Sequence, residues 1–269
     1  MGARRDPVTL PTGDTTAAAL ARMYDLDLVD DPGDLELYLA LAARSDGRVL
    51  ELAVGSGRIA VPLAAAGNRV TGVDNDSAML DRARRRAAAE GLDAVTLELV
   101  EADIVGLELP GGGGFGFAFL ALNSLMALPG RVAQRAAIQA LADHLAPGGI
   151  AAVDVWLPDA EDLARYDGRV ILEWPRLDPV TGTIVTKTGS AQYDAATGTI
   201  ALTSIFEEGG QGSPPVRWVR SDRLRIVSAD ELISFADAAG LRVETLAGSY
   251  DLEPLGPGSE RAVLVAIKD

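Results

Sequence analysis

A glycine-rich segment that follows an apolar run carries the clearest chemical signal in the sequence. The run 48–53 predicts a buried strand, the tripeptide Gly-Ser-Gly at 55–57 follows it, and a helix is expected over 57–66. Glycine lets a ligand come close to the backbone, and the first turn of a helix offers free N–H groups with a partial positive charge. Asp74 ends the next predicted strand, where a carboxylate can accept hydrogen bonds from both hydroxyls of a ribose. The segment therefore predicts a site for a nucleoside-containing ligand.

Two kinds of cofactor fit this pattern, and a tight turn without any ligand fits it as well. Gly55, Gly57 and Ala60 match G-x-G-x-x-A, and with Asp74 downstream they also suit a dinucleotide such as NAD. Further polar residues lie at the ends of predicted strands, and these are Glu51, Asp103 and Asn123. The carboxyl ends of parallel strands share the edge where open α/β sheets bind ligands. A dinucleotide enzyme does not need these residues. It also does not need the two helices expected before the first strand or the closing pair of strands, so this class is disfavoured.

The elements that must position these residues alternate along the chain. Strands are predicted over 48–53, 69–73, 95–100, 115–122 and 150–156, with helices over 57–66, 77–90 and 132–145. This alternation predicts right-handed βαβ units around a parallel sheet. A helix over 229–239 and strands over 241–246 and 262–267 follow later, and the last two are expected to form an antiparallel hairpin at the sheet edge.

Between these parts, four β-rich runs indicate an antiparallel insertion. They cover 169–177, 183–193, 199–207 and 217–226, and two similar turns with glycine at 182 and 198 separate the first three. We therefore predict an α/β, Rossmann-like fold with a seven-stranded, mostly parallel sheet and a C-terminal antiparallel hairpin, plus an antiparallel β insertion after strand five. The binding domain comprises 1–165, with N-terminal helices within 1–47, and 228–269, whereas 166–227 form the insertion.

Composition excludes several classes of protein. The 269 residues carry 24 Lys and Arg against 39 Asp and Glu, and the net charge of −15 makes a nucleic-acid partner improbable. No cysteine is present, and the single histidine, His144, excludes a His-rich metal site, so no metal is expected. No apolar run approaches the length of about 20 residues that spans a bilayer, and no signal-peptide core follows the N-terminus. We expect a cytoplasmic protein without a membrane partner.

The stretch 24–156 resembles class I S-adenosylmethionine-dependent methyltransferases, and the order of elements fits through residue 269. V-L-E-L-A-V-G-S-G-R-I-A looks like the first motif of that family, T-G-V-D-N-D-S-A-M-L like the second and E-A-D-I like the third. F-L-A-L-N-S-L and L-A-P-G-G-I-A-A-V-D look like the fourth motif and the turn into strand five. Ala53 departs from the pattern, because the family usually has a glycine there. The resemblance implies S-adenosylmethionine as cofactor and S-adenosylhomocysteine as product.

Cofactor contacts follow from matching these motifs residue by residue. The leading helices are similar to those of glycine and amino-sugar N-methyltransferases, in which a tyrosine near the N-terminus closes over the cofactor. The implied cofactor-binding residues are Tyr24, Tyr38, Glu51, Ala53, Gly55, Ser56, Gly57, Arg58, Asp74, Asn75, Met79, Ala102, Asp103, Ile104, Leu120, Leu122 and Leu125.

Methyl transfer from a sulfonium is an in-line displacement, for which alignment and exclusion of water are the main tasks of the protein. The candidates for catalysis are Asn123 to orient the acceptor, Asp154 as general base and Tyr24. His144 is expected at the opposite edge of the sheet, outside the site. The insertion is expected over the mouth of the site as a lid or as a homodimer surface. Its candidates for lining an acceptor pocket are Tyr166, Trp174, Tyr193, Trp218 and Arg223.

The sequence thus predicts an S-adenosylmethionine-dependent methyltransferase with a small-molecule acceptor, a metabolite or natural product, and nitrogen is slightly favoured over oxygen. Two alternatives stay open at this point. One is an NAD(P)-dependent oxidoreductase, and the other is a non-catalytic protein that binds S-adenosylmethionine or S-adenosylhomocysteine. Asn123 and the next three residues lack the two prolines of the N-P-P-Tyr motif of nucleic-acid amino-methyltransferases.

Overall fold

A computed structural model describes residues 16–30, 32–109, 112–209 and 214–269. The predicted N-terminal tail, residues 1–14, lies outside the described residues. The helices are α1 (Thr16–Asp27), α2 (Leu35–Arg44), α3 (Ala60–Ala65), α4 (Ser77–Ala89), η1 (Ser124–Ala127), α5 (Gly130–His144), α6 (Ala160–Arg165) and α7 (Ala229–Ala238). The strands are β1 (Arg48–Leu52), β2 (Val70–Asp74), β3 (Leu97–Glu101), β4 (Phe115–Leu120), β5 (Leu145–Trp156), β6 (Asp167–Leu177), β7 (Ile184–Asp194), β8 (Thr199–Gly209), β9 (Val216–Arg225), β10 (Leu241–Ala247) and β11 (Arg261–Lys268).

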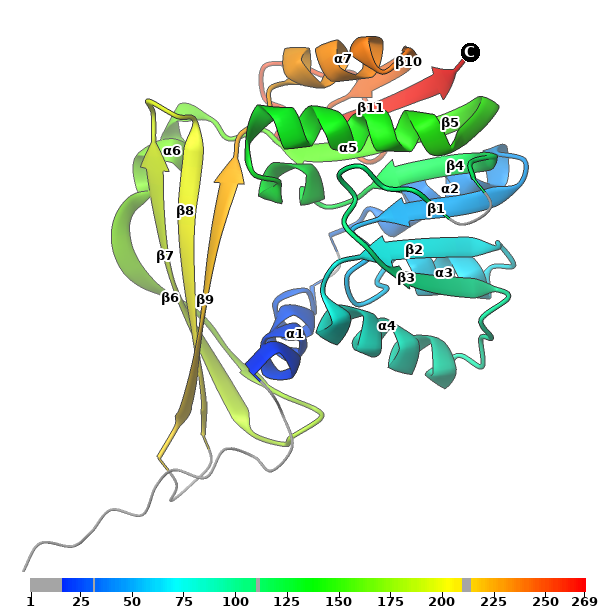
Figure 1. The fold of residues 1–269 in the computed structure, drawn as a ribbon. Coiled ribbons are helices and arrows are strands. Elements are labelled where there is room, and N and C mark those ends of the chain that lie inside the picture. The colour runs from blue at the N-terminus through cyan, green and yellow to red at the C-terminus, as the bar shows by residue number, and fades with distance from the viewer. Residues whose placement is uncertain (1–15, 31, 110–111, 210–213) are drawn as a thin grey trace, which may run out of the picture.

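The larger sheet has seven strands in the order β10-β11-β5-β4-β1-β2-β3, and helices cover both of its faces (Figure 1). The pairs β3–β2, β2–β1, β1–β4 and β4–β5 are parallel, whereas β11 runs antiparallel to both β5 and β10. All six residues of β4 are buried, as expected for a central strand that is covered on both sides. The predicted fold class is confirmed, with one refinement. β11 is inserted between β5 and β10, so only one strand of the closing hairpin lies at the edge.

Strand β5 begins at Leu145, five residues before the predicted start. The Pro-Gly-Gly stop at 147–149 does not end the pairing, because Phe115 pairs with Leu145 and Phe117 pairs with Ile150. The register shift between these pairs is a bulge, in which Gly148 adopts a positive φ of 78°. The extra residues are thus absorbed within the strand.

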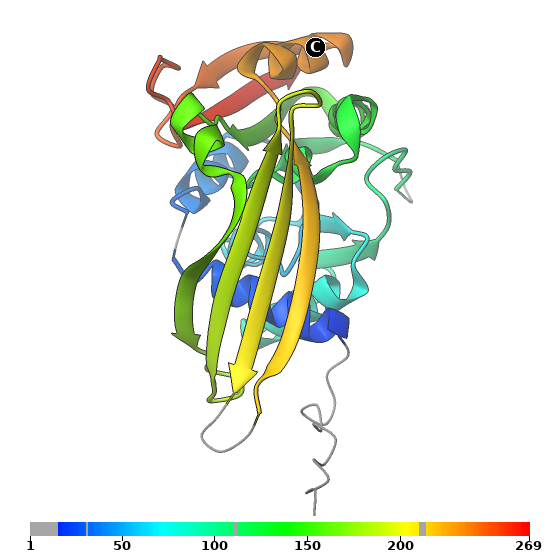
Figure 2. The same ribbon diagram turned by 90° about the vertical axis from the view of Figure 1, so that its left-hand side faces the viewer.

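The second sheet contains β6-β7-β8-β9, all antiparallel, and stands beside the carboxyl ends of the parallel strands (Figures 1 and 2). The two predicted turns have the same geometry. Gly182 and Gly198 have φ values of 70° and 63°, and the carbonyl four residues earlier accepts a hydrogen bond from each glycine N–H. We call this four-stranded sheet the lid sheet.

Helix α1 lies between the lid sheet and α4 (Figure 1). Its apolar side, Ala19, Met23 and Leu26, packs in one cluster with Val185, Phe206 and Trp218 of the lid sheet. The helix therefore joins the two sheets at the mouth of the carboxyl edge.

Candidate active site

The glycine-rich turn after β1 is fixed by its backbone conformation. Ala53, Gly55 and Gly57 all have positive φ values, at 56°, 55° and 76°. Glycine tolerates this conformation, whereas alanine at position 53 is strained by about 1–2 kcal/mol. A side chain at Gly57 would meet Val61 and Ala83 at 3.0 and 3.2 Å, so this glycine permits close packing against α4. The positive φ of Gly57 also explains why α3 starts at residue 60 and not at 57 as predicted.

Asp74 at the end of β2 is held by the same turn. One of its carboxylate oxygens accepts a hydrogen bond from Gly55 N at 2.8 Å, and the other accepts one from Asp76 N at 2.9 Å. Burial raises the pKa of Asp74, and these backbone donors counteract the rise. The carboxylate is therefore oriented by the backbone before any ligand arrives.

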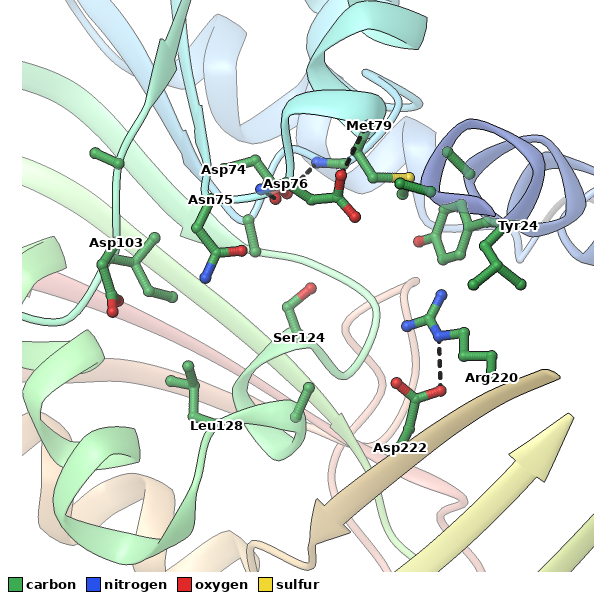
Figure 3. A pocket seen from close by; sticks show the side chains of 18 residues that line it. Tyr24, Asp74, Asn75, Asp76, Met79, Asp103, Ser124, Leu128, Arg220 and Asp222 are labelled. Atoms are coloured by element: carbon green, nitrogen blue, oxygen red, sulfur yellow. Dashed lines mark hydrogen bonds and ion pairs between the residues drawn. The ribbon is translucent and has the colours of Figure 1, made fainter. Parts of the chain in front are cut away.

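A cavity of about 520 Å³ opens at this edge (Figure 3). Many residues that the sequence predicted as cofactor contacts line it. These are Tyr24, Ala53, Gly55, Asp74, Asn75, Met79, Ala102, Asp103 and Ile104. The structure therefore brings the motifs after β1, β2 and β3 together around one space.

The other predicted cofactor residues lie outside the cavity lining. Ser56 donates a hydrogen bond to Asp25 at 2.6 Å, and Arg58 makes two hydrogen bonds of 2.6 Å to the buried Asp34. The side chain of Asp34, which directly precedes α2, makes no capping hydrogen bond to that helix and binds Arg58. Leu120 and Leu125 are fully buried in the core, and Leu122 is half-buried with a φ of 48°.

Tyr38 and Asp154 form a buried hydrogen-bonded cluster below the end of β4. Tyr38 Oη donates to Asp154 Oδ1 at 2.6 Å, and Leu122 N donates to the same oxygen at 2.7 Å. Tyr250 Oη donates to the second oxygen at 3.1 Å. Burial raises the pKa of Asp154, and the three donors counteract the rise. Since its side chain is fully buried and bonded, Asp154 is placed to support the backbone at Leu122.

Asn123, the other polar candidate for catalysis, also acts on the backbone. Its φ is 63°, and its side-chain oxygen accepts a hydrogen bond from Trp156 N at 2.5 Å. The side chain thus ties the end of β4 to the end of β5. Ser124, the next residue, lines the cavity.

Glu51 of β1 does not line the cavity, and its surroundings favour the neutral form of its carboxyl. Its side chain is buried, and among the described residues its Oε2 atom has no hydrogen-bond partner. Burial raises the pKa of Glu51 well above 4.5, although Arg58 opposes the rise. A buried polar atom without a partner beside the glycine-rich turn fits a ligand that carries a donor, such as the amino group of an amino-acid moiety.

The wall opposite the cofactor motifs comes from residues that the sequence did not single out. Arg220 and Asp222 of β9 face the cavity together with Tyr24 (Figure 3), and Arg220 Nε lies 2.7 Å from Asp222 Oδ2. Arg223, which was proposed for the acceptor pocket, follows them on the exposed, opposite face, since side chains alternate along a strand. Trp218 packs on α1 with Trp174 beside it.

His144 lies away from this edge, as predicted. It is the last residue of α5 and is buried, and its Nδ1 atom lies 2.8 Å from the carbonyl oxygen of Ala140. α5 leads into the amino end of β5, whereas the cavity lies at the carboxyl ends of the parallel strands.

The strand order, the glycine-rich turn and the acid after β2 define the class of doubly wound α/β domains that bind a nucleoside cofactor at the carboxyl edge of the sheet. Residues 49–149 match a family model described as "Methyltransferase domain". The resemblance to class I S-adenosylmethionine-dependent methyltransferases is thereby confirmed, and S-adenosylmethionine is the cofactor of the class. This finding excludes the alternative of an NAD(P)-dependent oxidoreductase.

Solved structures agree over nearly the whole chain. The CcbJ methyltransferase from Streptomyces caelestis is 26% identical, with a TM-score of 0.74 over 89% of this chain and 97% of that one. An S-adenosylmethionine-dependent methyltransferase from Clostridium acetobutylicum (16% identity, TM-score 0.77, 94% and 99% covered) shares the fold. The sugar N-methyltransferase KedS8 from Streptoalloteichus does so too (18% identity, TM-score 0.75, 99% of both chains covered).

Among curated proteins, the uncharacterized protein Rv1403c of Mycobacterium tuberculosis is 48% identical over 50 residues. The matched stretch covers 19% of this chain and 18% of that protein. Within the described residues, none of the helices has both the length and the apolar character required to cross a membrane.

Proposed function

We propose that this protein transfers a methyl group from S-adenosylmethionine to an amine nitrogen of a small metabolite or natural product. The observation that carries the proposal is the composition of the cavity. Its floor and one wall come from the cofactor motifs, and its other wall comes from α1, η1 and the lid sheet. One cavity therefore offers room for the cofactor and for the atom that accepts the methyl group.

The bound cofactor supplies an electrophilic methyl group on a sulfonium. The protein's own residues then have to hold the acceptor in line and exclude water. Asp222 offers a carboxylate that attracts an acceptor ammonium, and Tyr24 brings a hydroxyl to the same cavity. The ammonium loses a proton to solvent before the neutral amine attacks the methyl carbon. Asp154 and Asn123 act on the backbone at 122–123 through the hydrogen bonds described above, so we assign them a positioning role.

Two features support nitrogen over oxygen. A hydroxyl acceptor generally needs a base, whereas an amine needs only to be positioned in its neutral form. The chain's single histidine lies at the far end of α5, and the oxygens of Asp154 already accept three hydrogen bonds. The carboxylates of Asp74, Asp76, Asp103 and Asp222 outnumber the single guanidinium among the lining residues, which favours a cationic amine. KedS8, whose fold this chain shares, is described as a sugar N-methyltransferase.

The test has two stages. Calorimetry with S-adenosylhomocysteine measures cofactor-site binding, and Asp74→Asn serves as the variant expected to weaken it. Release of S-adenosylhomocysteine from S-adenosylmethionine is then followed with matched amines and alcohols, for example D-glucosamine against D-glucose. Turnover with amines alone is the expected result. Turnover with alcohols alone contradicts the choice of nitrogen, and tight binding without turnover on any acceptor supports the non-catalytic alternative.

A further inference from the structure

A second cavity, of about 610 Å³, lies against the lid sheet. It is lined by Gly189 and Ala191 of β7, by Leu202 and Ser204 of β8, and by Tyr166 before β6. The alternation of burial along β7 places Gly189 on the same face as Val185 and Lys187, which are buried on the side of α1. This face of the lid sheet also carries Arg220 and Asp222 of the first cavity.

The strand register makes the two cavities neighbours. Ser204 pairs directly with Arg220, and Leu202 pairs directly with Asp222. Side chains of directly paired residues point to the same face and lie about 5 Å apart. The wall of the first cavity on β9 therefore continues, one strand further, as the wall of the second cavity on β8. The Arg220–Asp222 ion pair stands at the junction.

The second cavity suits an uncharged, amphipathic body. Leu202 and Ile171 contribute apolar surface, and Ser204 contributes a hydroxyl group. The charged side chains at its edge already have partners. Lys187 pairs with Asp27 and Glu173, at 2.5 and 2.8 Å, and the Arg169 guanidinium pairs with Asp167 at 2.9 Å. The volume lies within the range of about 300–1,000 Å³ that holds a drug-sized ligand.

The ion pair between Arg220 and Asp222 at this junction is weak and easily separated. The side chains of Arg220 and Asp222 are 41% and 33% exposed, and ion pairs this open contribute about 0–1 kcal/mol. An amine that enters between them can therefore replace the guanidinium as the partner of Asp222 at little cost. The short side chain of Ala191 on β7 leaves space behind the junction, whereas the space over Gly189 is taken by the carboxylate of Glu173, which pairs with Lys187.

We propose that the second cavity binds the body of the methyl acceptor, while its amine reaches through the Arg220–Asp222 junction into the cofactor cavity. The acceptor is then an amphipathic amine of natural-product size and not a molecule as small as glycine. This inference rests on the proposed function, because it places the acceptor of that reaction.

The test uses aza-analogues of S-adenosylmethionine in which a nitrogen replaces the sulfur and carries alkyl chains of increasing length in place of the methyl group. In the wild-type protein, chains long enough to cross from β9 to β8 should bind about tenfold more tightly than S-adenosylhomocysteine, the gain expected from burying about two methylene groups. Leu202→Trp fills the second cavity and should abolish this gain while leaving the affinity for S-adenosylhomocysteine unchanged. Ala191→Phe, one strand further from the cofactor, should shorten the longest chain that still gains affinity.

Val219→Trp is the matched control, because Val219 is 50% exposed and lies on the opposite face of β9. It should retain the full gain in affinity. If S-adenosylhomocysteine itself does not bind, the proposed function fails. If it binds but longer chains add no affinity, or if Leu202→Trp keeps the gain, the placement of the acceptor is overturned while the proposed function stands. Methylation of glycine at equal rates by the wild type and Leu202→Trp also overturns it.

Discussion

Replacing Glu51 by Gln tests the electrostatic reading of the site most directly. Glu51→Gln keeps the size of the side chain and removes its charge. Glu51 is buried, Oε2 has no partner among the described residues, and Arg58 is engaged in two hydrogen bonds to Asp34. Burial therefore raises the pKa of Glu51 well above 4.5 despite Arg58, with nearby Asp34 and Asp74 adding to the rise. The folded protein without its cofactor should hold this carboxyl protonated to a higher pH than the unfolded chain does.

The sign of the effect on stability follows from this difference. Because the folded state binds the proton more tightly, Glu51 favours folding below its unfolded pKa, and this contribution is lost as the pH rises through the folded pKa. Within that window the free energy of unfolding of the wild type should fall by up to about 1.4 kcal/mol per pH unit relative to Glu51→Gln. The variant, which stays neutral at every pH, should therefore be the more stable protein at pH 8, and the difference should shrink towards pH 5.

Urea unfolding followed by tryptophan fluorescence, at several pH values from 5 to 8, measures this difference. The cofactor supplies the second readout, since a ligand ammonium would pair with the ionised carboxylate. Hydrogen bonds to charged groups contribute about 1.5–3 kcal/mol, so Glu51→Gln should weaken S-adenosylhomocysteine binding by about 10- to 100-fold. A stability difference that does not vary with pH, together with unchanged affinity, would refute the assignment of Glu51 as a buried carboxyl that awaits a ligand.

Further predictions concern two other carboxylates, Asp154 and Asp74, and the histidine His144. Asp154→Ala leaves the buried hydroxyl of Tyr38 and the N–H of Leu122 without their acceptor. It should therefore lower the free energy of unfolding by about 2–5 kcal/mol in urea. Asp154→Asn should lower it less, because it retains an acceptor oxygen. Asp74→Asn should weaken S-adenosylhomocysteine binding by about tenfold or more in calorimetry, with the control Asp93→Asn unchanged. His144→Gln should leave turnover at the wild-type level, and lost turnover at unchanged thermal stability would contradict its placement outside the site.

The fold could be predicted because its signals are local. Alternating strands and helices, glycine stops and the two D-x-x-T-G-T turns each depend on a few consecutive residues, and the seven-stranded sheet follows from their order. The helices η1 and α6 were not predicted, because four and six residues are too few to show a helical period. The early start of β5 was missed because a bulge depends on the partner strand β4, which local sequence does not reveal.

In the candidate site, too, some residues could be predicted from local sequence and others could not. Asp74 and Asp103 could be placed because the carboxyl ends of parallel strands must meet at one edge. Arg220 and Asp222 could not, because the face that β9 turns toward the cavity depends on how the lid sheet packs against α1. Arg223 was predicted to line the acceptor pocket but lies on the other face, because a shift of one residue along a strand moves a side chain to the opposite face. The sequence likewise does not show that the hydroxyls of Tyr38 and Tyr250 donate hydrogen bonds to the carboxylate of Asp154.

Helix α1 explains why the position of Tyr24 depends on both halves of the molecule. On one side, Asp25 accepts hydrogen bonds from Ser56 in the glycine-rich turn, at 2.6 Å, and from Arg82 of α4, at 2.5 Å. On the other side, Asp27 accepts hydrogen bonds from Trp174 and Lys187 of the lid sheet, at 2.9 and 2.5 Å. Tyr24 lies between these anchors in the sequence and lines the cavity between the two parts. A movement of the lid sheet that keeps the Asp27 contacts must therefore move Tyr24 relative to the cofactor motifs or strain the contacts of Asp25. The same helix that forms one wall of the cavity thus links the lid sheet to the glycine-rich turn.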